Sequence, residues 1–216
     1  MYGYVKVGSA VPKLRVADCV YNKEEILKLV EAAAAKQVRV LSFPELSVTG
    51  YTCADLFFQA PLLHAAEQAI QEIAEATEAL NIFLLIGAPI AVDNQMFNCA
   101  VALYKGKLLG IVPKTHIPNY SEFYEERWFA SADDLLTEEI TYAGQNVPIG
   151  ADLIFAAADF PALKIGVEIC EDLWVPIPPS SYLSLYGATL LLNLSASNEL
   201  ASKPGYRRQL VSQQSA

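Results

Sequence analysis

Predominantly apolar runs recur along the chain and alternate with segments of helical spacing. Runs of this length that are bounded by turn residues predict buried strands. We expect such strands at residues 4–11, 38–43, 82–90, 152–160, 163–170 and 188–197. Residues 96–114 predict a hairpin, because two apolar runs meet at Lys105-Gly106.

Helical spacing separates these strands. Asn22 followed by Glu25 resembles a capping box and predicts a helix that runs from there to about residue 35. Residues 62–80 predict a second helix, and Pro61 suits its start. Shorter helices are expected at residues 53–60, after the Pro-rich bend at 175–181 and from 205 onward, and an irregular segment at 116–150. Alternation of apolar strands with helices favours an α/β fold in which helices cover the sheets.

Composition narrows the classes of protein. The chain has 216 residues, of which 53% are hydrophobic, and this suits one domain with a sizeable core. The formal net charge of −9 repels phosphate, so we expect neither a nucleic-acid nor a membrane partner. No apolar stretch reaches about 18 residues, and no signal-peptide pattern opens the chain. The four scattered cysteines fit reduced thiols and a cytoplasmic location.

Three reactive side chains follow predicted strands, namely Glu45, Lys114 and Cys170. Taken singly, each residue favours a structural interpretation without catalytic chemistry. Glu45 would be a carboxylate in a surface turn, Lys114 a solvated lysine at a strand edge and Cys170 a buried core thiol. Taken together, they are a base, a cation and a nucleophile at the ends of strands, where α/β folds build their sites. This combination suits nucleophilic attack on an amide.

Other chemistries lack their residues. His64 lies in an Ala-rich helix, and His116 has no second ligand at zinc spacing, so we expect no metal site. The chain also lacks G-x-S-x-G, a phosphate-binding G-x-x-x-x-G-K-[ST] loop and a Gly-rich dinucleotide fingerprint.

Three motifs carry a resemblance to a known family. FPELSVTGY (43–51), VPKTHIPNYSEFYEERWF (112–129) and VEICEDLWVP (167–176) resemble the signature regions of the nitrilase, or carbon–nitrogen hydrolase, superfamily. The resemblance implies an α-β-β-α sandwich and a catalytic triad of Glu45, Lys114 and Cys170. It also implies a second glutamate that positions the substrate and triad, matched by Glu122 and less well by Glu125.

Within that superfamily, the motifs are most similar to the glutamine-hydrolysing domain of glutamine-dependent NAD synthetases. The resemblance implies that glutamine is bound by Tyr51, Tyr120, Glu122, Glu171 and Ser197. It implies a glutamine amidotransferase half that makes glutamate and ammonia through a cysteine thioester. The ammonia would feed ATP-dependent amidation of deamido-NAD⁺ by a synthetase domain of the same polypeptide.

The same resemblance sets the expected organisation. We interpret residues 1–216 as one nitrilase-like amidase domain that is incomplete on its C-terminal side, with the synthetase domain absent. It implies no cofactor or metal for this domain, ATP and Mg²⁺ for the synthetase domain alone, and a homo-oligomer. Two alternatives remain open at this point: a stand-alone amidase or carbamoylase of the same superfamily, and an inactive truncated scaffold.

Overall fold

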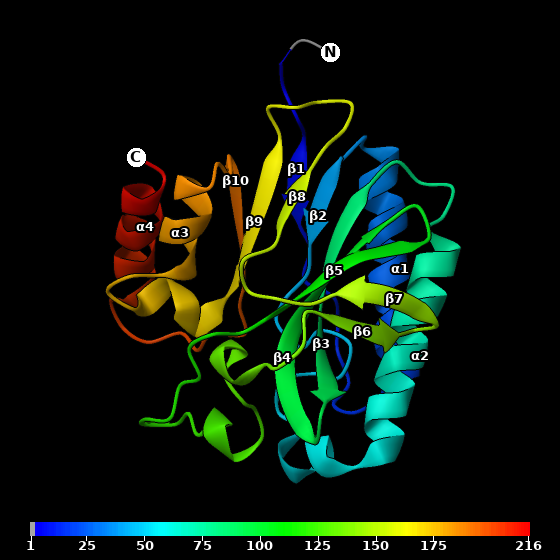
Figure 1. Ribbon diagram of the computed structural model, residues 1–216, viewed down its shortest axis with the longest axis vertical. Helices are drawn as coiled ribbons and strands as arrows, with labels where there is room; N and C mark the ends of the chain where they lie inside the picture. Colours follow the sequence, from blue (N-terminus) through cyan, green and yellow to red (C-terminus); the bar gives the residue numbers. More distant parts are fainter. Residues whose placement is uncertain (1–2) are drawn as a thin grey trace.

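Two sheets pack face to face in the computed structural model, which describes residues 3–216 (Figure 1). The larger sheet has the order β1-β2-β3-β4-β5, with β1–β3 parallel and β4 and β5 antiparallel to their neighbours. Its strands are β1 (Val7–Ser9), β2 (Val40–Ser42), β3 (Phe83–Val92), β4 (Gln95–Tyr104) and β5 (Lys107–Pro113). The smaller sheet consists of β10 (Leu190–Leu194), β9 (Lys164–Ile169) and β8 (Ile154–Ala156).

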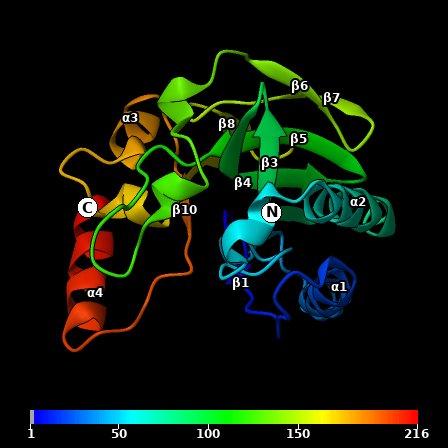
Figure 2. The same ribbon diagram turned by 90° about the horizontal axis from the view of Figure 1, so that it is seen from below.

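Helices cover the outer faces of both sheets. The larger sheet carries α1 (Cys19–Ala35) and α2 (Ala60–Ala76), whereas α3 (Pro179–Leu185) and α4 (Lys203–Gln214) lie beyond the smaller sheet (Figures 1 and 2). The resulting four layers confirm the predicted α-β-β-α sandwich. No helix in the described range is both long and apolar enough to cross a membrane.

The alternation of side chains along the strands divides the core in two. Buried residues of α1 and α2 at helical spacing pack on one face of the larger sheet, among them Ile26, Val30, Ile70 and Ile73. The opposite face packs on the smaller sheet through Leu85, Ala100, Ala102, Val112, Val167 and Ile169. Each fully buried Leu, Ile or Val stabilises the fold by about 1.5–3 kcal/mol, so this contact holds the two sheets face to face.

The turns of the larger sheet follow the predicted chemistry. Lys105 and Gly106 join β4 to β5 with φ values of 49° and 76°, which is the left-handed backbone that a two-residue hairpin needs. The short 3₁₀ helix η1 (Ala54–Phe58) confirms the helix expected near residues 53–60.

Two expectations about local structure were wrong. The N-cap of α1 is Asp18, whose carboxylate accepts the Tyr21 N–H at 3.0 Å. Asn22 instead lies inside α1, where its buried amide bonds the backbone of Arg15 and Val48. This amide ties two loops to the helix, a long-range role that local spacing does not reveal.

The segment 116–150 is also more regular than expected. It contains a hairpin of β6 (Glu139–Tyr142) and β7 (Gln145–Pro148), which turns at Ala143-Gly144 with positive φ at both residues. Irregular backbone remains between residues 114 and 138, interrupted by the short 3₁₀ turns η2 (Glu125–Arg127) and η3 (Ala132–Asp134).

Candidate active site

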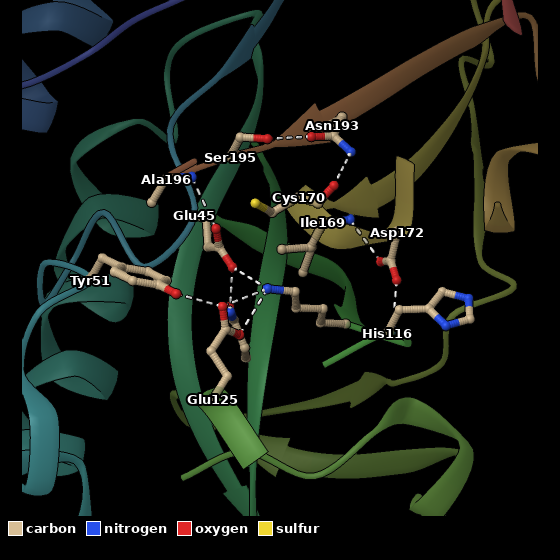
Figure 3. Close-up of polar contacts among 12 residues, drawn as sticks. Glu45, Tyr51, His116, Glu125, Ile169, Cys170, Asp172, Asn193, Ser195 and Ala196 are labelled. Carbon is tan, nitrogen blue, oxygen red and sulfur yellow. Dashed lines mark hydrogen bonds and ion pairs between the residues drawn. The ribbon is translucent and has the colours of Figure 1, made fainter. Parts of the chain in front are cut away.

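Three strand ends converge at one edge of the sandwich. Glu45 follows β2, Lys114 follows β5, and Cys170 opens the 3₁₀ turn η4 (Cys170–Trp174) directly after β9. β2 and β5 run in the same direction, so their carboxyl ends share an edge, and β9 supplies the facing sheet. Figure 3 shows the side chains of Glu45 and Cys170 close together between the sheets, and Lys114 Nζ reaches the same carboxylate at 2.7 Å from Glu45 Oε1. The structure therefore brings together the three residues that the sequence singled out.

Lys114 lies at the centre of a buried ionic cluster. Its Nζ donates to Glu45 Oε1 at 2.7 Å and to Glu125 Oε1 and Oε2 at 3.0 and 2.8 Å. The side chains of Lys114 and Glu45 are fully buried, and that of Glu125 is 2% exposed. All three N–H donors of the ammonium are thus engaged, so an incoming oxyanion must replace one of these bonds.

The charges in this cluster hold one another in place. Burial by itself lowers the pKa of Lys114, but the charges of Glu45 and Glu125 outweigh it and raise that pKa above its ordinary value. Burial also raises the pKa of Glu125, against the effect of the ammonium. Lys114 therefore stays protonated at neutral pH and carries a fixed positive charge beside Glu45, and a charge of this kind can stabilise an oxyanion.

Cys170 stands on a strained turn. Its φ is 47°, in the left-handed region that costs a non-glycine residue about 1 kcal/mol or more. This turn breaks the alternation of β9, so Cys170 joins Val167 and Ile169 in the core between the sheets. Glu168 faces α3 instead, where its carboxylate accepts the Ser180 N–H at 3.0 Å. Glu168 and Cys170 therefore do not share a face, although residues two apart on a regular strand do.

The Cys170 thiol is not a preformed thiolate. Burial raises its pKa, and the charge of Glu45 raises it further, whereas Lys114 lowers it by less. The thiol accordingly needs a base at the moment of attack. Glu45 is the carboxylate placed to accept that proton.

Backbone and amide donors fix the orientation of Glu45. Asn98 Nδ2 donates to Glu45 Oε1 at 2.7 Å, and the Ala196 N–H donates to Oε2 at 2.9 Å. Gly87 on β3 allows the loop after β2 to lie close, because a Cβ there would be 2.8 Å from the Glu45 carbonyl carbon. Both sheets therefore hold this carboxylate, through β4 on one side and the segment after β10 on the other.

Comparison with known proteins agrees with this geometry. The family described as Carbon-nitrogen hydrolase matches residues 7–216. The chain belongs to this carbon-nitrogen hydrolase family. It is 39% identical over 209 residues to a glutamine-dependent NAD(+) synthetase of Mycobacterium leprae, and 30% identical over 217 residues to that of Homo sapiens. These alignments cover 97% and 92% of this chain but 31% and 30% of the relatives, so the chain spans about a third of their length.

Solved structures give the same picture. A glutamine-dependent NAD(+) synthetase from Cytophaga hutchinsonii superposes with a TM-score of 0.83 at 30% identity, over 96% of this chain and 33% of that one. An amidase from Nesterenkonia sp. superposes with a TM-score of 0.75 at 17% identity, over 99% of this chain and 73% of that one. The second likeness concerns the fold alone.

The second glutamate of this carbon-nitrogen hydrolase is not the one that the sequence favoured. Glu122 is exposed and makes no side-chain contact with Lys114, whereas Glu125 is buried against the ammonium. The reason is local: Ser121 has a φ of 52°, and the chain turns into η2, which directs Glu125 inward. Glu125, and not Glu122, therefore occupies the position beside Lys114.

The other predicted substrate-binding residues fall into two groups. Tyr51 donates its hydroxyl to Glu125 Oε1 at 2.6 Å and so extends the ionic cluster. Tyr120 is half exposed and donates to Glu171 Oε1 at 2.9 Å beside the Cys170 turn. Ser197 is partly exposed, and its side chain makes no hydrogen bond to any residue from 3 to 216. The backbone of its neighbour reaches Glu45 instead.

Sequence reasoning missed the two donors that hold Glu45, which are Asn98 Nδ2 and the Ala196 N–H. It also missed the carboxylate of Asp172. Asn98 was hidden in an apolar strand, where a buried Asn is itself a signal because it needs partners. Burial raises the pKa of Asp172 to about 7.

Across residues 3–216, no group of three or more His, Cys, Asp and Glu side chains could hold a metal ion.

Proposed function

We propose that this carbon-nitrogen hydrolase domain hydrolyses the side-chain amide of glutamine, with Cys170 as nucleophile. One observation carries the proposal. A buried thiol on a strained turn faces a carboxylate, Glu45, that is already paired with the Lys114 ammonium. A thiol, base and cation in this arrangement are the parts that acyl transfer requires.

In the first half of the reaction, Glu45 takes the thiol proton as Cys170 attacks the amide carbon. The C–S bond forms, and the amide carbonyl oxygen becomes an oxyanion. Lys114 and the Glu171 backbone N–H, the first after the nucleophile, stabilise that oxyanion. Glu45 then returns the proton to the amide nitrogen, the C–N bond breaks, and ammonia leaves a thioester on Cys170.

The second half releases the acid. Glu45 takes a proton from water, and the resulting hydroxide attacks the thioester carbon. The C–S bond breaks, the sulfur recovers a proton, and glutamate leaves. Glu125 and Tyr51 keep Lys114 in place throughout, since removing one partner of a buried ion pair costs about 3–5 kcal/mol. Every step uses side-chain and backbone groups of this chain together with water, and we propose that this domain uses no cofactor.

The residues beside Cys170 suit an amino acid substrate. Glu171 and Tyr120 form a polar pair next to the turn, and the Glu171 carboxylate can pair with the α-ammonium group of glutamine. The similarity to proteins named glutamine-dependent NAD(+) synthetase favours glutamine over other amides. We assign Tyr51, Tyr120, Glu171 and Ser197 to glutamine on this basis.

The longer relatives suggest the wider reaction. We propose that the ammonia made here serves a synthetase domain of the same polypeptide, which binds ATP and Mg²⁺ and amidates deamido-NAD⁺. The partial coverage of those relatives, about a third of their length, supports a division into two activities. A cytoplasmic location and a homo-oligomer stay predictions, the first supported by free thiols at all four cysteines.

An amide panel tests the proposal directly. The purified chain is offered glutamine, asparagine, simple aliphatic amides and N-carbamoyl compounds, and released ammonia is measured. We expect glutamine to give the highest kcat/KM, and the Cys170→Ala variant to release none above background. Preference for an aliphatic amide or a carbamoyl compound would replace glutamine with that substrate class. Retained hydrolysis by Cys170→Ala would remove the thiol from the mechanism.

A further inference from the structure

Two backbone segments must keep their relative positions for this site to work. One carries Lys114 at the end of β5, in the larger sheet, and the other carries Cys170 at the end of β9, in the smaller sheet. No hydrogen bond of the strand ladders joins the two sheets at this point, because each ladder lies within its own sheet. The packing between the sheets is apolar and does not fix a strand end along its own direction.

The Asp172 carboxylate links the backbones of these two segments. Asp172 Oδ1 accepts the N–H of His116, two residues past Lys114, at 2.7 Å. Asp172 Oδ2 accepts the N–H of Ile169, the residue before Cys170, at 2.9 Å. Figure 3 shows the carboxylate lying between these two backbone segments, on the far side of Cys170 from Glu45.

The environment of Asp172 makes this contact demanding. The residue is 1% exposed, and both of its oxygens bond to backbone N–H groups. Lys114 is near enough to favour the ionised carboxyl, and Glu168 is near enough to oppose it, but neither bonds to it directly. Burying a carboxylate that bonds only backbone amides costs desolvation free energy, so this contact contributes little net stability to the fold. It is an effective way to hold two backbones in register, because both bonds are charge-assisted.

We propose that Asp172 is a positioning residue that locks the Cys170 turn to the strand end carrying Lys114. The inference rests on the proposed amidase chemistry and adds a residue to it. Asp172 touches neither the substrate nor the reacting atoms. It sets the distance between nucleophile and ammonium, on which the oxyanion geometry depends.

The Asp172→Asn variant tests the lock because it keeps the shape of the side chain. An amide offers one acceptor oxygen where the carboxylate offers two, so one of the two backbone N–H groups loses its partner. A shift of about 1 Å between catalytic groups can cost about a hundredfold in rate. We expect kcat for glutamine to fall by about ten- to a hundredfold, with KM within about threefold of the wild-type value.

A second readout does not depend on glutamine. The rate at which iodoacetamide labels Cys170 reports base-assisted attack by the same thiol, and we expect it to fall by about tenfold in Asp172→Asn. The matched control is Asp133→Asn, because Asp133 is exposed on η3 and its side chain makes no hydrogen bond or ion pair with any residue from 3 to 216. All rates are expressed per folded protein, determined by circular dichroism, so that loss of stability does not count as loss of catalysis.

The outcomes separate the two ideas. A wild-type chain that labels at Cys170 but does not hydrolyse glutamine would contradict the proposed substrate and leave the labelling test of the lock intact. Labelling and kcat in Asp172→Asn within threefold of the wild type would overturn the lock. A raised KM with an unchanged kcat would also overturn it, because Asp172 would then act on substrate binding. Equal losses in Asp133→Asn would overturn it as well.

Discussion

Gly87 on β3 offers a test of how closely Glu45 must be placed. A Cβ at this position would lie 2.3 Å from the Leu46 nitrogen, 2.6 Å from the Pro44 carbonyl oxygen and 2.8 Å from the Glu45 carbonyl carbon. All three are backbone atoms, so no side-chain rotation relieves the contact. Gly87→Ala should therefore push the loop that carries Glu45 away from β3.

The size of the displacement follows from these distances. Ordinary van der Waals contact begins near 3.4 Å, so the shortest contact requires a separation of about 1 Å. Overpacking of this kind costs about 1–3 kcal/mol of stability. The same shift at a proton acceptor can cost about a hundredfold in rate, because proton transfer depends on hydrogen-bond reach. We expect Gly87→Ala to remain folded and to lose about a hundredfold in kcat.

The assay compares glutamine hydrolysis by Gly87→Ala with hydrolysis by Gly205→Ala. Gly205 lies in α4, and a Cβ there would meet nothing within 4 Å. The control variant should keep its kcat and gain about 0.5–1 kcal/mol of stability, as Gly-to-Ala changes in helices do. If Gly87→Ala hydrolyses glutamine within threefold of the wild-type rate, the close placement of Glu45 is not needed and the reasoning fails.

Two further predictions concern the charges around the site. Glu125→Gln should lower kcat by about a hundredfold, because Glu45 then pairs alone with the ammonium and is less able to take the thiol proton. The control Glu122→Gln should keep kcat within about threefold of the wild-type value. If the kcat values show the reverse pattern, Glu122 is the second glutamate of the site. The pKa of Asp172 is raised from 3.8 to about 7, so its contribution favours the folded state below pH 4 and is lost as pH rises through about 7. Relative to the wild type, Asp172→Asn should therefore gain stability between pH 5 and pH 8, by at most about 3 kcal/mol, when urea unfolding is measured at both pH values. An equal difference in stability at both pH values would contradict the raised pKa.

Much of the site could be predicted from sequence because it is built at strand ends. Apolar runs that stop at Glu45, Lys114 and Cys170 locate those ends, and the layered fold brings the ends together. The hairpin between β4 and β5 was equally predictable, since Lys105-Gly106 supplies the backbone conformation that the turn needs.

What the sequence could not show depends on segments far apart along the chain. The choice between Glu122 and Glu125 is decided by one left-handed residue in an irregular loop, for which periodicity gives no signal. Asn98 bonds a carboxylate 53 residues away, and Asp172 bonds a backbone N–H 56 residues away. The mistaken N-cap has the same origin, because Asn22 is committed to contacts outside its helix.

The central claim is that Cys170 carries the acyl group during turnover. The chain is mixed with glutamine and quenched in acid within the first turnover, and the peptide that contains Cys170 is weighed by mass spectrometry. We predict a γ-glutamyl adduct on Cys170 that disappears when hydroxylamine is added before the quench, with γ-glutamyl hydroxamate in its place. Ammonia release by a competent chain with no adduct and no hydroxamate, or an adduct on Cys19, Cys53 or Cys99 instead, would contradict the mechanism.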